Sequence, residues 1–309
     1  MDFLHRDDCK FNLTTSISDM EPCIHHVKKY MISICLTLYL FTSGIAATYS
    51  HANDPSDSLE TNQTTLITEI LATDSLLSMD LNERIDYFSE HLIGSPYASS
   101  PLGEGLCGSH DKKPLFDLSS FDCMTFVEQV IALSMSNDTE QFLWNLQHIR
   151  YKYGEIDLMM RNHFVISDWI VNNSWILEDF TSEIGSHYVK KMSKSIDHGK
   201  FFKKFGITDT TRPALVNIEY IPHQNIVYIT DRLRTGDIIC FITRKQNLFV
   251  DHMGFFIRKN DRMFLRHASK PAKRVKDDLF INKIKTLSNQ KYSAGIIILR
   301  LKPETDMYH

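Results

Sequence analysis

The stretch Ser119-Ser120-Phe121-Asp122-Cys123-Met124-Thr125-Phe126-Val127-Glu128-Gln129-Val130-Ile131 decides how this chain folds. Its apolar side chains recur with the 3.6-residue period of an amphipathic helix. Ser119 or Ser120 is the expected N-cap, because a hydroxyl can accept a hydrogen bond from a free N–H group of the first turn. Cys123 therefore falls in the first turn of a predicted helix.

Cys123 in this position is a candidate nucleophile. A thiol attacks as its thiolate, and the unpaired N–H groups and positive dipole end of a helix N-terminus favour that anion. The same N–H groups could stabilise the oxyanion that forms when an amide carbonyl is attacked. The alternative interpretation is a small buried core residue, which describes most free cysteines. Taken alone, the stretch favours this second interpretation.

Further helices are predicted on both sides of this stretch. Asp80 can cap a helix over 81–92, which Gly94 and Pro96 end, and a Gly/Ser/Pro-rich loop follows up to about residue 120. Another helix is predicted over 139–148, followed by mixed structure up to residue 202. The first half of the chain is thus mainly helical.

The apolar period changes to two after Pro213, as half-buried strands require. Helices in the N-terminal half packed on a C-terminal antiparallel sheet predict an α+β fold. We expect a single catalytic domain over 66–305. The predicted strands cover 216–220, 236–243, 252–257, 263–268 and 294–301.

The composition excludes some classes of partner. The chain has 309 residues, and its 34 basic and 38 acidic side chains give a formal charge of -4. Because no basic stripe could neutralise a run of phosphates, we expect no binding to nucleic acid. Nothing in the sequence indicates an obligatory protein partner.

The first 52 residues resemble a leader with a signal peptide. Basic residues at 25–29 precede an apolar run over 31–47, and small residues follow it. We predict cleavage near Ala47 or Ala52 and an exported, periplasmic or secreted protein; an uncleaved membrane anchor is the alternative. The polar residues 53–65 predict a flexible lead-in.

Cysteine usage after cleavage leaves at least one free thiol. Of six cysteines, three would leave with the leader, and Cys107, Cys123 and Cys240 remain. At most one disulfide can form among three thiols. Cys107 in the loop and Cys240 in an apolar strand are interpreted as structural.

Two histidines could serve the thiol. His252 and His267 lie on successive predicted strands, so a hairpin would place both imidazoles on one face, with His252 as base and His267 as its orienting partner. His163 is a third candidate, and a Cys/His/His zinc site is the rival combination. We expect no metal or other cofactor, because the sequence lacks closely spaced ligand pairs.

Five separated segments share a pattern with a known class of enzyme. They are Gly94-Ser95-Pro96-Tyr97, Phe121 to Glu128, Gly236-Asp237, His252-Met253-Gly254 and His267-Ala268-Ser269. Together they resemble the NlpC-type papain-like cell-wall hydrolases. The N-acetylmuramoyl-L-alanine amidase-like branch of that class is resembled more narrowly by Thr125, Glu128 and residues 149–151 and 161–163. The similarity extends over about residues 67–301.

This resemblance implies a papain-like fold and metal-free hydrolysis of the amide between N-acetylmuramic acid and L-alanine in muropeptides. It implies Cys123 as nucleophile, His252 as base, His267 as third polar member and the Tyr97 hydroxyl in the oxyanion pocket. The interval between the two histidines is a few residues longer than in many relatives. A stem-peptide endopeptidase, a thiol-dependent acyl transferase and a non-catalytic wall-binding module are the alternatives. Arg150, Arg161 and Asn162 are expected to contact substrate carboxylates, or else to be ordinary surface or capping residues.

Overall fold

A computed structural model of the chain describes residues 64–73, 76, 78–105 and 108–303. The expected leader, most of the lead-in and Cys107 lie outside these residues. Within them, no helix combines the length and apolar character needed to cross a membrane.

The N-terminal half is helical, as predicted. After a helix over 64–71, α3 (Leu81–His91) begins at Asp80, whose carboxylate accepts a hydrogen bond from the Glu83 N–H at 2.9 Å. The Glu83 carboxylate accepts in turn from the Asp80 N–H, so the cap is reciprocal. Next come α4 (Cys123–Ser134) and α5 (Thr139–Arg150).

Short elements connect the helices to the sheet. They are η3 (Lys152–Gly154), η4 (Val165–Trp169), α6 (Ile170–Asn172), α7 (Thr181–Gly185), η5 (Ser186–Tyr188), α8 (His198–Phe202), η6 (Lys203–Phe205), η7 (His223–Tyr228) and η8 (Thr230–Arg232). Of these, η4 is a π-helix, a form that often occurs at functional sites.

Within the described residues the sheet has eight strands, and every strand pair in it is antiparallel. Its order is β2-β3-β8-β4-β5-β6-β7, and β1 pairs with β8. The predicted α+β class, with helices first and an antiparallel sheet second, is therefore confirmed. The strands are β1 (Leu177–Asp179), β2 (Lys190–Ile196), β3 (Ala214–Pro222), β4 (Ile238–Thr243), β5 (Val250–Lys259), β6 (Arg262–Ser269), β7 (Arg274–Leu279) and β8 (Ser293–Leu301).

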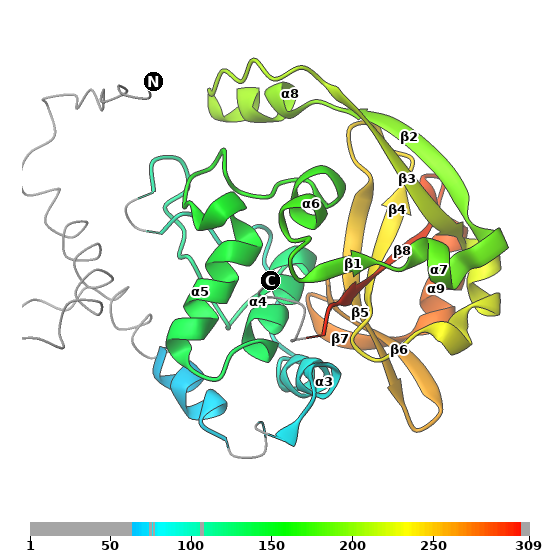
Figure 1. The fold of residues 1–309 in the computed structure, drawn as a ribbon, viewed down its shortest axis with the longest axis horizontal. Helices are drawn as coiled ribbons and strands as arrows, with labels where there is room; N and C mark the ends of the chain where they lie inside the picture. The colour runs from blue at the N-terminus through cyan, green and yellow to red at the C-terminus, as the bar shows by residue number, and fades with distance from the viewer. Residues whose placement is uncertain (1–63, 74–75, 77, 106–107, 304–309) are drawn as a thin grey trace, which may run out of the picture. The chain divides into compact units, whose positions relative to one another are not determined.

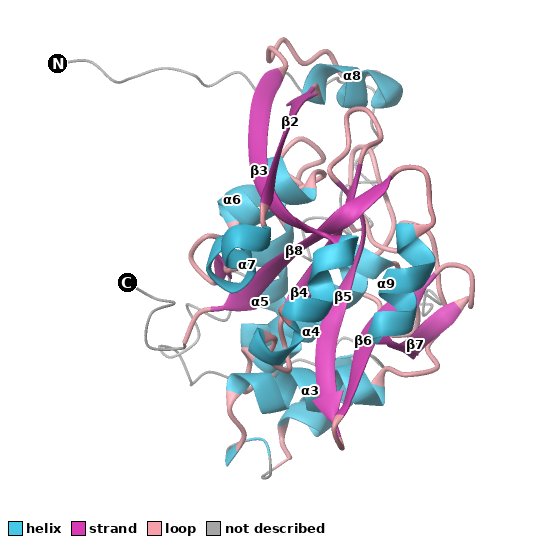
Figure 2. Ribbon diagram, turned by 90° about the vertical axis from the view of Figure 1, so that its right-hand side faces the viewer, coloured by secondary structure: helices cyan, strands magenta, loops and turns pink. Residues whose placement is uncertain are grey.

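Both faces of the sheet are covered by helices (Figures 1 and 2). On one face, side chains such as Cys240, Met253 and Phe255 pack with those of α3, α4 and α5. On the other face, side chains such as Phe241 and Phe256 pack with α7 and with α9 (Phe280–Ser288). Cys240 is fully buried in the first of these cores, which agrees with its structural interpretation.

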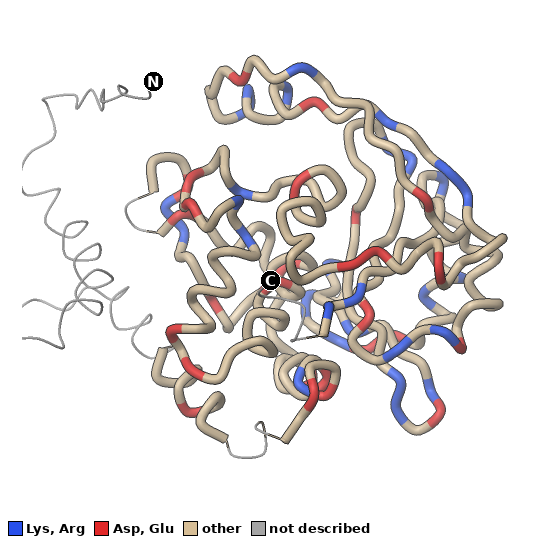
Figure 3. The backbone as a smooth tube through the Cα atoms, in the orientation of Figure 1, with Lys and Arg blue, Asp and Glu red and all other residues tan. Residues whose placement is uncertain are grey.

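Strands β2 and β3 form a hairpin that, with α8, extends beyond the rest of the sheet; we call residues 190–222 the arm (Figure 1). Lysine is frequent along β2 (Figure 3). The sequence did not predict β2, β7 or α9. In β2 and β7, polar side chains dominate and obscure the alternation of buried and exposed residues.

Candidate active site

Cys123 is the first residue of α4, and Asp122 is its N-cap. Oδ1 of Asp122 accepts hydrogen bonds from the N–H groups of Met124 at 3.1 Å and Thr125 at 2.8 Å. The Thr125 hydroxyl accepts in return from the Asp122 N–H at 3.0 Å. The predicted N-cap at Ser119 or Ser120 was therefore wrong, because a carboxylate closer to the helix caps it. The first-turn position of Cys123 is confirmed.

Several backbone N–H groups lie near the thiol of Cys123. Those of Met253, Cys123 and Met124 lower its pKa and so favour its anion. Burial outweighs them, and together with the charge of Asp122 it raises the pKa of the Cys123 thiol to about 12. The resting site therefore holds a neutral thiol.

Helix α4 reaches the sheet at β5. The rings of Phe126 and Phe255 lie 5.9 Å apart, centroid to centroid, in an edge-to-face contact, and both are fully buried. This packing places Cys123 near the backbone of Met253, the residue after His252. The ring of His252 itself stacks on Phe241 at 5.8 Å, in the core on the other face of the sheet, because successive strand side chains point to opposite faces.

The β5–β6 hairpin brings the two histidines together. Its strand pairs run from Lys259 and Arg262 near the turn to Phe255 and Arg266, and the histidines lie just beyond the last pair. There Nε2 of His252 lies 2.7 Å from Nδ1 of His267. The predicted hairpin, with both imidazoles on one side, is confirmed.

Both imidazoles are neutral near pH 7. Burial, followed by the charge of His267, holds the pKa of His252 well below its usual range. Burial also lowers the pKa of His267, with Lys283 and Lys276 adding to the shift and Asp278 opposing it. A neutral imidazole can accept a proton, which a base in this position needs.

Asp278 extends this chain of contacts and was missed in the sequence. Its Oδ2 lies 3.0 Å from Nε2 of His267, and its Oδ1 lies 2.6 Å from Nζ of Lys276. Alternation over 274–279 could have placed Asp278 on the same face as Lys276. It could not have shown that Asp278 contacts His267, because His267 lies on another strand.

Tyr97 lies close to Cys123. Its segment pairs with Phe121, because the Phe121 N–H donates to the Pro96 carbonyl and the Ala98 N–H donates to the Phe121 carbonyl, both at 3.0 Å. Burial raises the pKa of Tyr97, and the nearby Cys123 raises it further. The structure thus brings Tyr97 to the start of α4, and its oxyanion role stays a prediction.

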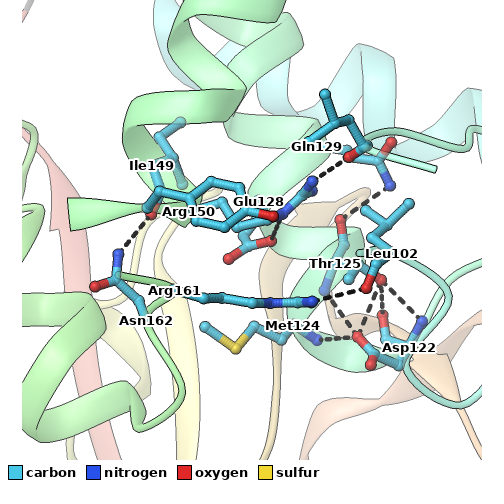
Figure 4. A network of polar contacts seen from close by, with 12 residues as sticks. Leu102, Asp122, Met124, Thr125, Glu128, Gln129, Ile149, Arg150, Arg161 and Asn162 are labelled. Carbon is cyan, nitrogen blue, oxygen red and sulfur yellow. Dashed lines mark hydrogen bonds and ion pairs between the residues drawn. The ribbon is translucent and has the colours of Figure 1, made fainter. Parts of the chain in front are cut away.

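Arg150 lies in the interior. Its side chain is 2% exposed, and its Nε lies 3.0 Å from Oε2 of the equally buried Glu128 (Figure 4). Its Nη1 donates to the Leu115 carbonyl. Because a loop covers the end of α5, Arg150 does not face solvent and is not positioned to clamp a substrate carboxylate.

Asn162 is also in the interior, and Arg161 is nearly so. Asn162 is 2% exposed and donates to the Ile149 carbonyl at 3.1 Å, whereas Arg161 donates to the Leu102 carbonyl at 2.7 Å (Figure 4). Both bind backbone that runs beside α5. These contacts hold loops in place. The expected contact with a substrate carboxylate stays a prediction for Arg161, whose side chain is 16% exposed and lies 3.9 Å from Oδ2 of Asp111.

His163 does not join the site. Its Nε2 contacts the Leu158 carbonyl at 2.7 Å, and burial lowers its pKa to about 4. Among the described residues, no group of three or more His, Cys, Asp or Glu side chains could hold a metal ion. The rival zinc site therefore finds no support in this part of the chain.

A hollow of about 190 Å³ lies where η4, the arm and the start of β5 meet. Apolar side chains line most of it, among them Phe164, Ile196, Phe249 and Val250. Val250 precedes His252 by two residues on β5. The hollow therefore lies next to the strand segment that leads to His252.

Comparisons with known proteins find similar folds. A protein of Legionella pneumophila strain Philadelphia 1 has a similar structure, with 25% identity and a TM-score of 0.74 over 80% of this chain and 97% of that one. A structure named as an N-acetylmuramoyl-L-alanine amidase from Bacteroides uniformis has 24% identity and a TM-score of 0.61 over 72% and 99%. No curated protein matches the chain.

The sequence pattern of the family described as N-acetylmuramoyl-L-alanine amidase-like matches residues 87–291. This range extends from within α3 to the turn that precedes β8 and includes every candidate residue of the site. It also covers well over half of the chain. The chain therefore belongs to the N-acetylmuramoyl-L-alanine amidase-like family.

Proposed function

We propose that this protein is a cysteine amidase of bacterial peptidoglycan, which hydrolyses the amide between N-acetylmuramic acid and L-alanine in muropeptides. Family membership supports an amidase, and the Bacteroides uniformis neighbour carries the name of this activity. The thiol at the start of a helix packed on an antiparallel sheet supports a papain-like architecture of the NlpC type.

One observation carries the proposal. Nε2 of His252 lies 2.7 Å from Nδ1 of His267, and the backbone N–H of the next residue, Met253, is close enough to Cys123 to lower the thiol pKa. The candidate nucleophile therefore lies near the strand that carries the candidate base, and His267 can orient that base.

The reaction is acyl transfer through a thioester. As the Cys123 sulfur attacks the lactyl carbonyl carbon, Nδ1 of His252 takes the thiol proton. The tetrahedral intermediate then expels the amine of L-alanine, which receives that proton. Water attacks the thioester, with His252 again taking a proton, and releases the carboxylic acid and the thiol. The N–H groups of Met124 and Thr125 already donate to Asp122, so the Cys123 N–H and the Tyr97 hydroxyl stabilise the oxyanion.

The resting charges fit general-base catalysis. With the thiol pKa raised and the imidazole pKa lowered by burial, the pair is neutral before substrate binds. Proton transfer therefore accompanies attack, as it does for a serine nucleophile. This differs from a preformed thiolate, which the helix position alone had suggested.

The test is incubation of the purified chain with defined muropeptides, followed by mass spectrometry of the products. Wild type should release the intact stem peptide with a free L-alanine amine, and Cys123→Ala should release none while keeping its thermal stability. Cys240→Ala is the matched control, because Cys240 is buried within β4, and it should retain activity. Equal turnover by Cys123→Ala would refute the thiol mechanism, and cuts within the stem peptide would instead identify an endopeptidase.

An exported location accompanies this function, because peptidoglycan lies outside the cytoplasmic membrane. Residues 1–52 supply the expected signal peptide. Cell fractionation with N-terminal sequencing should find a chain that begins after Ala47 or Ala52. An unprocessed cytoplasmic chain would contradict this part of the proposal.

A further inference from the structure

We propose that Asp278 is a positioning residue that sets the tautomer of both histidines and so leaves Nδ1 of His252 unprotonated as the base. The inference rests on the proposed function, since it assigns His252 the role of base. It concerns a residue outside the Cys123, His252 and His267 group.

The contacts form an unbroken line across three adjacent strands. Nε2 of His252 on β5 lies 2.7 Å from Nδ1 of His267 on β6, and Nε2 of His267 lies 3.0 Å from Oδ2 of Asp278 on β7. Asp278 pairs in register with Leu265, two residues before His267, so it is a diagonal neighbour on the same face.

An ionised carboxylate only accepts hydrogen bonds, so Nε2 of His267 must be the donor to Asp278. In a neutral imidazole the other nitrogen then carries the lone pair, and Nδ1 of His267 accepts. The proton between the two rings therefore belongs to Nε2 of His252. His252 is also neutral, so its Nδ1 is the bare nitrogen.

The surroundings of Asp278 keep it ionised. Nζ of Lys276 on β7 lies 2.6 Å from Oδ1, and Nζ of Lys283 on α9 lies 3.6 Å from Oδ2. The hydrogen bond from His267, despite partial burial, holds the pKa of Asp278 far below its usual range. The same two lysines disfavour a proton on His267, so the neutral tautomer persists.

The alternative charge state would disable the base. A doubly protonated His267 would donate from Nδ1 to Nε2 of His252, and neutral His252 would then carry its proton on Nδ1. That nitrogen could not accept the thiol proton. The carboxylate is thus needed to select the tautomer, and the two lysines limit the protonation of His267.

Histidine tautomers can be read directly by long-range ¹H–¹⁵N correlation NMR, because protonated and bare ring nitrogens have well-separated ¹⁵N shifts. The experiment uses the full chain labelled with ¹⁵N-histidine, with the signals assigned by comparison with His252→Gln and His267→Gln. Wild type should show protonated Nε2 and bare Nδ1 in both rings. A proton on Nδ1 of either ring in wild type would overturn the inference, whether or not the chain hydrolyses muropeptides.

Asp278→Asn supplies the second arm. An amide can present an N–H group to Nε2 of His267, so we expect both rings to lose the single tautomer. Turnover of a defined muropeptide should fall by at least about tenfold. Unchanged tautomers in Asp278→Asn would also overturn the inference, and loss of turnover without a tautomer change would indicate a purely structural role.

Asp277→Asn is the matched control. Asp277 is the adjacent residue, but its carboxylate pairs with Arg266 at 2.8 Å and no contact links it to either imidazole. This variant should lose stability and keep the wild-type tautomers. If turnover is absent even in wild type, the proposed function fails while the NMR comparison still decides the role of Asp278.

Discussion

Nε2 of His252 lies 2.7 Å from Nδ1 of His267, although the two residues are 15 positions apart. The contact depends on Gly254, which follows His252 by two residues on β5 and faces His267 on β6. A Cβ atom at Gly254 would come within 2.7 Å of the His267 Cβ and 2.6 Å of the Arg266 carbonyl oxygen. The pair of rings therefore needs a residue without a side chain beside it.

Gly254→Ala should displace His267 and reduce turnover. Relief of the overlap requires the backbone of β6 to move, and we expect a loss of about 1–3 kcal/mol in the free energy of unfolding. Chemical denaturation and muropeptide turnover measure the two effects. Gly206→Ala is a control away from the site; its positive φ of 75° predicts some destabilisation without loss of activity. Full turnover by Gly254→Ala would show that the ring contact is not needed.

Alkylation of Cys123 should depend steeply on pH. Because burial raises the thiol pKa to about 12, the thiolate is scarce at pH 7 and its fraction rises as the pH increases. The rate of reaction with iodoacetamide should therefore climb about tenfold per pH unit between pH 7 and pH 10. Mass spectrometry of the Cys123 peptide distinguishes it from the other cysteines. A fast rate that is already constant near pH 7 would instead indicate a preformed thiolate and imidazolium pair.

Arg150→Met should destabilise the fold and leave substrate binding intact. The substitution leaves Glu128 as a buried carboxylate without its ion-pair partner, which should lower the free energy of unfolding by about 3–5 kcal/mol. Burial already raises the pKa of Glu128 against the opposing charge of Arg150. Denaturation measures stability, and the KM of the folded protein should not change.

The double variant Glu128→Leu with Arg150→Met is the matched control. It removes both charges together, and much of the lost stability should return. A higher KM in Arg150→Met or in the double variant would instead support a contact between Arg150 and the substrate.

Lys194→Met should loosen the loop that leads to His252. Nζ of Lys194, on the arm, donates to the carbonyls of Thr243, Lys245 at 2.9 Å and Leu248 at 2.6 Å, which saturates its three N–H groups. We expect a loss of about 1–3 kcal/mol in stability. Reduced turnover should accompany it, because Leu248 and the start of β5 line the hollow near the site.

Lys191→Met tests whether any lysine on β2 would have this effect. Its side chain is 83% exposed and pairs with Glu219 at 3.4 Å on the surface. Removal of such a pair should change stability by less than about 1 kcal/mol. Equal effects of the two substitutions would argue against a specific role of Lys194.

Several features of the protein follow from the sequence alone. The apolar period places α3, α4 and α5, and the change to alternation after Pro213 places β3, β4, β5, β6 and β8. The sequence also predicts the position of Cys123 in the first turn of α4 and of the two histidines on one hairpin. Helix starts and hairpins depend mainly on residues that are close together in the sequence.

Only the tertiary structure decided the rest. Arg150 is covered by a loop that its own neighbours do not reveal. Asp278 joins the histidines because β7 aligns with β6, and this register is set by the whole sheet. Periodicity encodes which face of an element is buried, but the partner that a polar side chain meets there comes from distant segments whose packing no local pattern records.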